Sequence, residues 1–436
     1  MATRQKSTSL RSGLKSGKNS LPGPDDIHRV VLSNGVIVLT RPNFDSPSVS
    51  VTGYFYAGSL ADPDEKLGLS DFTAAALMRG THERSFDAIY NGLESVGASL
   101  GFDSLMHTTS FGGRCLVEDL GLVLDLIAEI LKDPAFPDTE VEKLRAQLLT
   151  GLAIRAQDTG DMASLTFDKI IFEGHPYSRP GDGYPQTIQA ISRDDLVEFH
   201  RRYYGTNGLV IAVVGAVEPA KVVAEVERTL GAWKSVNQVE QPGLPAHKPL
   251  TRIVQEHHKI AGKSQSDLVI GVVGPKRKDP EYIAASLGNS ILGQFGLMGR
   301  IGDVVREKSG LAYYAHSSLS PGVGPGAWEV SAGVNPKNIK KATELILKEL
   351  DRFVKRGVTS EELADNQANY IGRLPLSLES NSGVAGALIN IERYDLGLDY
   401  YRKYADLVRA VTRDEILMAA RKYIYPGKLA IAVAGP

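Results

Sequence analysis

The nine histidines of this 436-residue sequence could bind a metal or act as acid and base, but their spacing does not suit that chemistry. Two histidines four positions apart share one face of a helix and bind zinc together, while a glutamate beside them activates the bound water as a general base. None of the nine histidines stands in an H-x-x-E-H pattern or in its reverse. His257 and His258 are adjacent and would point apart in a strand, and we expect His82 and Glu83 in a loop. We therefore predict no metal ligand in this chain.

The overall composition is that of an ordinary globular protein and excludes several classes. Apolar residues make up 42% and charged residues 23% of the chain, and the net charge of −2 gives no footprint for nucleic acid or an anionic membrane. A single cysteine, Cys115, excludes an intrachain disulfide framework and is typical of a reducing compartment. No apolar run approaches the ~18–20 residues that span a bilayer. We expect a cytoplasmic protein without nucleic-acid or membrane partners.

The N-terminal segment differs in composition from the rest. Its first 24 residues contain no acid but carry Arg4, Lys6, Arg11, Lys15 and Lys18 among many serines. It lacks the apolar core of a secretory signal, and we expect a disordered basic tail over residues 1–26. Import into an organelle, directed by this tail, is the alternative interpretation.

An internal repeat organises the remainder of the chain. Residues 191–215 and 411–435 align without a gap at an offset of 220, and nine of the twenty-five aligned positions are identical. Each copy has helical periodicity, a turn, and a buried apolar strand. Because the offset is half the chain, we expect the duplication to cover the whole molecule.

Other segments of the two halves carry matching signals. A hairpin is expected around Asn34-Gly35, and Ser85 is a candidate N-cap for a helix closed by Gly97. In the second half, a helical stripe ends at Gly357, and a further helix begins near residues 359–361. The pattern predicts an α+β fold with two homologous α/β sandwich domains. They are expected at 27–236 and 251–436, with a polar, proline-bearing linker at 237–250.

The segment 68–81, GLSDFTAAALMRGT, resembles the metal-binding helix of the inverted-motif zinc peptidases. These are the pitrilysin and insulysin group, and the chain is more similar to their mitochondrial-processing-peptidase-like branch. Active members read approximately G-x-x-H-F-x-E-H-x-x-x-x-G-T. The matching positions of this chain are Gly68, Phe72, Leu77, Gly80 and Thr81.

The resemblance implies that the zinc ligands have been lost. Asp71 and Ala75 stand at the two histidine positions and Ala74 at the glutamate position. The third ligand of the family, a glutamate on a later helix, would fall near Gly151 or Leu152, and no acid occurs between Glu142 and Asp158. The resemblance thus implies a chain that is inactive alone.

Residues 299–317, GRIGDVVREKSGLAYYAHS, resemble the C-terminal half of the same family. There an Arg and a Tyr seven residues apart reach the substrate near the scissile carbonyl, and the matching residues are Arg306 and Tyr313. Upstream, residues 293–299 place glycines at Gly293, Gly296 and Gly299. The non-catalytic subunit of the processing peptidase has a glycine-rich loop thought to touch substrate, so this segment is a candidate substrate loop, with a tight turn as the alternative.

Two further segments resemble the family. Residues 97–111 match the edge strand along which active members lay an extended peptide, but Gly101 stands where the family tends to have Asn, which argues against peptide binding in the first half. In residues 171–178, IFEGHPYS, we expect His175 and Pro176 to be architectural.

The resemblance implies a role as half of an assembly. The family closes its cavity with four homologous domains in a clamshell, and this chain supplies two. The first hypothesis is a non-catalytic, substrate-binding subunit of a heterodimeric zinc metallopeptidase. Its homologous partner would carry H-x-x-E-H and the zinc, and the substrate would be an unfolded or extended peptide. The second is a structural or assembly subunit, like a respiratory-complex core protein. A homodimeric peptide-binding protein remains a third possibility.

Overall fold

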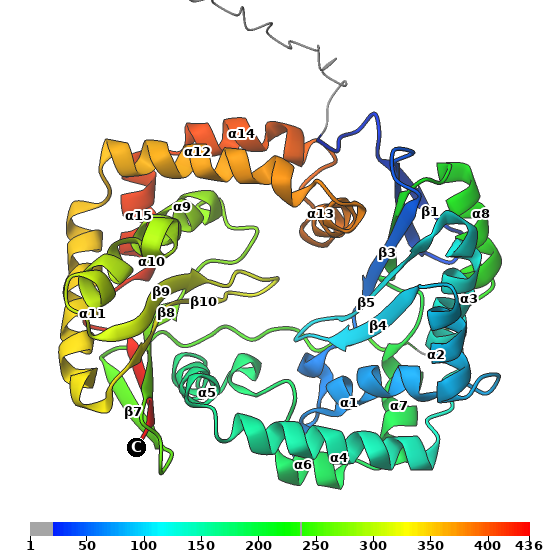
Figure 1. Cartoon of the computed structure of the whole chain (residues 1–436), viewed down its shortest axis with the longest axis horizontal. Helices are drawn as coiled ribbons and strands as arrows, with labels where there is room; N and C mark the ends of the chain where they lie inside the picture. Colours follow the sequence, from blue (N-terminus) through cyan, green and yellow to red (C-terminus); the bar gives the residue numbers. More distant parts are fainter. Residues whose placement is uncertain (1–20, 236–237) are drawn as a thin grey trace, which may run out of the picture.

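The computed structural model describes residues 21–235 and 238–436, in which each half of the chain forms a mixed β-sheet covered by helices (Figure 1). The first half contains β1 (His28–Val31), β2 (Ile37–Pro42), β3 (Ser48–Phe55), β4 (Ser99–Ser104), β5 (Thr109–Leu116) and β6 (Val210–Gly215). Its helices are α1 (Leu69–Ala76), α2 (Phe86–Ser95), α3 (Leu120–Lys132), α4 (Asp138–Arg155), α5 (Thr159–Ile171), α6 (Pro185–Ala190), α7 (Arg193–Tyr203) and α8 (Pro219–Leu230).

The second half repeats this plan with fewer strands. Its strands are β7 (Val254–Lys259), β8 (Ser266–Val273), β9 (Ala312–Leu319), β10 (Ala327–Val334) and β11 (Ala430–Gly435). Its helices are α9 (Tyr282–Gly293), α10 (Phe295–Gly302), α11 (Ile339–Arg356), α12 (Ser360–Ser377), α13 (Asn381–Tyr394), α14 (Tyr400–Ala410) and α15 (Arg413–Tyr423). A short π-helical segment, η6 (Asp303–Glu307), follows α10.

The strand orders of the two sheets confirm the predicted duplication and the α+β class. The first sheet runs β1-β2-β6-β3-β5-β4 and the second β7-β11-β8-β10-β9, which is the same order without a counterpart of β1. In each sheet one neighbouring pair is parallel, β2 with β6 and β7 with β11, and the other pairs are antiparallel. The strands β6 and β11, and the helices α7 and α15, occur at the offset of 220 that the sequence gives. The edge strands β4 and β9 are therefore equivalent.

The predicted helix starts are also confirmed. Ser85 accepts the Ala88 N–H at 3.2 Å, and Thr359 accepts the Glu362 N–H at 3.1 Å. Both side chains satisfy backbone donors that the first helical turn leaves unpaired.

The two halves exchange one helix each across the middle of the molecule (Figure 1). Helix α5 of the first half packs on β8 and β11 of the second sheet, where Phe167 contributes to a core shared with Ala430 and Ala432. Helix α13 of the second half packs on β3 and β6 of the first sheet, beside Tyr54 and Val210. Each sheet thus depends on the other half for the apolar cover of one face.

The segment before the first strand differs from the expected tail. Residues 1–20 lie outside the described part of the chain. Residues 21–26, which we had assigned to the tail, are instead held by Arg402 of α14, whose guanidinium donates to the Leu21 carbonyl and contacts the carboxylates of Asp25 and Asp26. Two adjacent acids opposite one arginine fix this segment, and the basic composition before it did not reveal the pairing.

The segment expected as the linker contains no helix or strand over residues 238–250, and residues 236–237 lie outside the described part. It is nevertheless anchored to the first half, since His175 is buried and its Nε2 lies 3.1 Å from the Pro245 carbonyl oxygen. His175 also accepts the Tyr177 N–H at 3.1 Å, which gives it the architectural role that we expected. Among the described residues, none of the helices is both long and apolar enough to cross a membrane.

Candidate functional site

The start of α1 is built around a buried carboxyl group. Asp62 accepts the backbone N–H groups of Gly68 at 3.0 Å and of Ser70 at 2.9 Å, and so replaces the side-chain cap that this helix lacks. Burial raises the pKa of Asp62 to about 7. Gly68 has φ = +92°, and a Cβ there would lie 2.7 Å from Ile188 Cδ1, so only glycine suits this position. The frame that holds the helix is intact.

The side chains on this frame do not fit a zinc ion. At the three helix positions, Asp71 offers one carboxyl group, and Ala74 and Ala75 offer no donor atom. Leu152 is 4% exposed, lies on α4, which packs against α1, and belongs to the apolar core of the first half. Burial, with smaller contributions from the carboxylates of Asp182 and Asp103, raises the pKa of Asp71 to about 6. Zinc sites of this kind need nitrogen donors or several anionic donors together.

The rest of the described chain offers no alternative centre. Across residues 21–235 and 238–436, no group of three or more His, Cys, Asp or Glu side chains could hold a metal ion. We therefore derive no metal-dependent step from this chain.

Arg306 and Tyr313 lie on two elements in contact in the second half. Arg306 is in η6 and Tyr313 is on the edge strand β9, and the Gly310 N–H donates to the Arg306 carbonyl at 2.8 Å. The Tyr313 side chain is 83% exposed. The Arg306 guanidinium is partly exposed, and within the described part of the chain only the Glu307 carboxylate lies within ion-pairing range of it, at 3.6 Å. Both side chains therefore have N–H or O–H groups that could donate hydrogen bonds to a ligand.

The structure does not bring this pair together with the α1 frame. Helix α1 contacts α4, α7 and β4, whereas η6 contacts α10, α11 and β9. Figure 1 places α1 and α10 on opposite sides of the molecule. One copy of the chain cannot apply both sets of residues to one peptide bond.

The glycine segment 293–299 is a compact turn against β9 rather than a regular helix. Gly296, Met298 and Gly299 have positive φ values of 61°, 71° and 62°. A Cβ on Gly293 would lie 2.1 Å from the Ser317 nitrogen, so glycine here allows the segment to lie directly on the edge strand. The Met298 sulfur accepts the Ala315 N–H at 3.4 Å, and Leu297 is exposed. Of the two interpretations of residues 293–299, the tight turn agrees with this backbone geometry. A role of the segment in substrate binding stays a prediction.

The strand β4 is at the edge of its sheet, as expected for residues 97–111. A Cβ on Gly101 would meet nothing within 4 Å, so a larger residue would fit at this position. The glycine there is not required by packing.

Comparison with known proteins decides the family. Residues 37–170 match the model of insulinase (peptidase family M16), and residues 190–370 match that of the peptidase M16 inactive domain. Together these segments span most of the chain and include both the α1 frame and Arg306. The chain belongs to the M16 peptidase family.

Similarity to individual M16 proteins extends over nearly the whole chain. An uncharacterized zinc protease of Streptomyces coelicolor is 27% identical over 423 residues, which cover 95% of this chain and 90% of that protein. A crystal structure of a peptidase M16 inactive domain from Pseudomonas fluorescens has a TM-score of 0.88 and 27% identity, covering 94% of this chain and 98% of that one. Subunit 1 of the mitochondrial cytochrome b-c1 complex of Rattus norvegicus is 26% identical over 270 residues, 61% of this chain and 55% of that protein.

A pair of carboxyl groups on the inner face of the second sheet was not predicted from the sequence of this M16 chain. Burial, with a smaller contribution from the Glu329 carboxylate on β10, raises the pKa of Asp168 on α5 to about 7. Burial also raises the pKa of Glu329, which accepts the Ser318 hydroxyl at 3.2 Å. The two residues are 161 positions apart in the chain, and their charges interact because α5 packs on the second sheet.

This pair predicts a pH-dependent stability. A carboxyl group whose pKa is higher in the folded than in the unfolded chain favours folding below about pH 4, and this contribution is lost as the pH rises through about 7. At pH 8, Asp168→Asn should therefore raise the free energy of unfolding, measured by urea denaturation, by about 1–3 kcal/mol relative to the unmodified chain. At pH 4 the two chains should be similarly stable. A stability difference of equal size at both pH values would show that Asp168 does not carry this penalty.

Proposed function

We propose that this chain is the non-catalytic, substrate-binding subunit of a two-chain M16 peptidase. The observation that carries the proposal is the contrast between the two sites. The α1 frame keeps its capping carboxyl and its glycine but has no donor set for zinc, whereas Arg306 and Tyr313 present donors to solvent at the edge strand β9 and the element beside it.

The partner in this proposal is a homologous chain with an intact H-x-x-E-H helix. That chain would hold the zinc, whose chemistry is the activation of water for attack on the scissile carbonyl. Two chains of two domains each would complete the four-domain cavity that the family resemblance implies. This division of roles explains why one site is degenerate while the other is kept. We place the pair in the cytoplasm, as the composition suggests.

The part of this chain is to hold the peptide. An extended substrate would receive hydrogen bonds from the Arg306 guanidinium and the Tyr313 hydroxyl at its backbone carbonyl oxygens. Because both groups are donors, they would also stabilise negative charge that develops on the carbonyl oxygen during attack. Their side chains are already exposed, so no burial has to be undone before the peptide binds.

A second candidate is a structural subunit without a role in proteolysis. The similarity to subunit 1 of the rat cytochrome b-c1 complex favours it, since that protein is named as a subunit of a complex and not as a peptidase. A scaffold does not require exposed donors at Arg306 and Tyr313, and for this reason we rank it second.

The test is to purify this chain alone and together with a homologous chain that carries the intact motif. We expect the chain alone to hold no stoichiometric zinc by mass spectrometry and to leave an unfolded fluorogenic peptide uncleaved, and we expect the pair to cleave it. Zinc-dependent cleavage by this chain alone would refute the proposal. A stable pair whose partner cleaves equally well without this chain would favour the structural role.

A further inference from the structure

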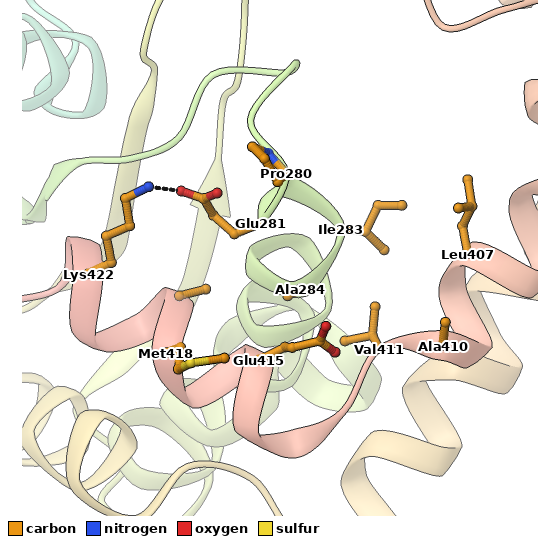
Figure 2. Close-up of a pocket in the computed structure, with 11 residues that line it drawn as sticks. Pro280, Glu281, Ile283, Ala284, Leu407, Ala410, Val411, Glu415, Met418 and Lys422 are labelled. Atoms are coloured by element: carbon orange, nitrogen blue, oxygen red, sulfur yellow. Dashed lines mark hydrogen bonds and ion pairs between the residues drawn. The ribbon is translucent and has the colours of Figure 1, made fainter.

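The second half carries an apolar groove on the side of α9, between α14 and α15 (Figure 2). Its volume is about 440 Å³, and its walls include Ile283 and Ala284 of α9 and Ala419 and Met418 of α15. Met418 is 62% exposed. In Figure 2 the Glu415 side chain points into the space between α9 and Val411. The groove is separate from Arg306 and Tyr313, which are not among its lining residues.

The duplication shows what occupies the equivalent place in the first half. There the corresponding elements are α1, α6 and α7, and the segment that ends at Leu67 lies among them. Leu67 is 8% exposed, and its carbonyl accepts the Thr187 hydroxyl of α6 at 2.7 Å. The adjacent Lys66 forms an ion pair with Asp195 of α7. A cation followed by an aliphatic residue therefore fills this site.

The second half fills this place less completely. The connection from β3 to α1 contains 13 residues (56–68), whereas that from β8 to α9 contains 8 (274–281). The shorter connection ends in Pro280 and Glu281, which line the groove, and Glu281 forms an ion pair with Lys422 of α15, the one cation among the lining residues. At the offset of 220, the buried Phe199 corresponds to Ala419, whose smaller side chain lines the groove.

The charges of the two sites differ in the same way. Asp195 and Glu415 occupy the same position at the offset of 220, and each closes the capping box of its helix. Asp195 has Lys66 as its cation partner, but Glu415 has none among the described residues and is exposed. An exposed carboxylate beside an apolar groove is complementary to a cation beside an aliphatic side chain.

We propose that this groove binds a segment of a second polypeptide in which a lysine or arginine precedes an aliphatic residue. The cation pairs with Glu415, and the aliphatic side chain rests on Ile283, Ala419 and Met418. The site reproduces in trans a contact that the first half makes in cis. It is a docking surface distinct from the proposed substrate site and does not depend on the proposed function.

The test uses the full chain with ¹³C-methyl methionine, because Met418 is one of only six methionines and lies in the groove. The probe is a capped peptide that copies residues 61–69, ADPDEKLGL. We expect a saturable shift of the Met418 methyl resonance, assigned with Met418→Leu. The resonance of Met298, beside the proposed substrate site, should not move, and this separates the two proposals.

The matched variants test the chemistry of the site. Glu415→Gln keeps the capping box and should weaken peptide binding about threefold to fivefold, as should glutamine in place of the peptide lysine. Serine in place of the leucine that follows this lysine should weaken it at least about tenfold. Asp414→Asn removes a neighbouring charge outside the groove and should leave binding unchanged.

Three results would overturn the proposal. One is a Met418 resonance that does not respond to millimolar peptide. Another is equal affinity of the Glu415→Gln and Asp414→Asn variants. The last is a Met418 resonance that shifts, without any peptide, when residues 1–20 are deleted, because the occupant would then belong to this chain and not to a second polypeptide.

Discussion

Replacing Arg306 by alanine is expected to lower kcat of the two-chain enzyme about 100-fold while leaving the stability of this chain unchanged. A preorganised donor that faces a developing oxyanion contributes about 10²–10³ in rate. The stability should not change because the guanidinium is partly exposed and, among residues 21–235 and 238–436, forms an ion pair with the Glu307 carboxylate alone, at 3.6 Å. Steady-state cleavage of an unfolded peptide by the reconstituted pair gives kcat and KM, and thermal unfolding of this chain gives the stability.

The companion change, Tyr313→Phe, removes one hydroxyl from a side chain that is 83% exposed, and a loss of about tenfold or more in kcat is expected. Lys308→Ala is the matched control, because Lys308 is an exposed cation two residues from Arg306 that pairs with Asp303. Its effect on kcat should be small. If Arg306→Ala and Lys308→Ala had the same effect, Arg306 would have no contact with the reacting carbonyl, although the chain could still be a subunit.

Replacing Leu152 by glutamate, the type of ligand expected at this position in active relatives, should destabilise the chain by about 3–5 kcal/mol. Leu152 is 4% exposed and belongs to the same apolar core as Phe72 and Leu144. A carboxylate there would be buried without the metal or the other ligands that could compensate its desolvation. Urea denaturation followed by circular dichroism measures the change.

The neighbouring position supplies the control. Gly151 lies on the exposed face of α4, and a Cβ there would meet nothing within 4 Å. Gly151→Glu should therefore stabilise the chain by about 0.5–1 kcal/mol, since glycine inside a helix is unfavourable. If both variants were equally stable, Leu152 would have to face solvent, and the interpretation of this position as core would be wrong.

Local signals in the sequence identified much of this fold. The hairpin at Asn34-Gly35 and the helix starts at Ser85 and Thr359 depend on neighbouring residues, so a short window contains the information. The ungapped match at an offset of 220 revealed the duplication, because each copy buries one face of its helix and the whole of its strand, which imposes the same apolar periodicity on both. The loss of zinc donors at Asp71, Ala74 and Ala75 is likewise a matter of residue types alone.

Contacts between distant segments were decided only by the tertiary structure. Three such interactions join positions far apart in the chain. The sheets exchange α5 and α13, Asp168 interacts electrostatically with Glu329, and Arg402 pairs with residues 25–26. Apolar periodicity tells that a helix has a face to bury but not which sheet will cover it. The sequence alone thus determined that the zinc ligands are lost. The groove at Glu415 is recognised only when α9, α14 and α15 are compared in space with α1, α6 and α7, because a cavity forms where side chains from several distant segments leave space unfilled.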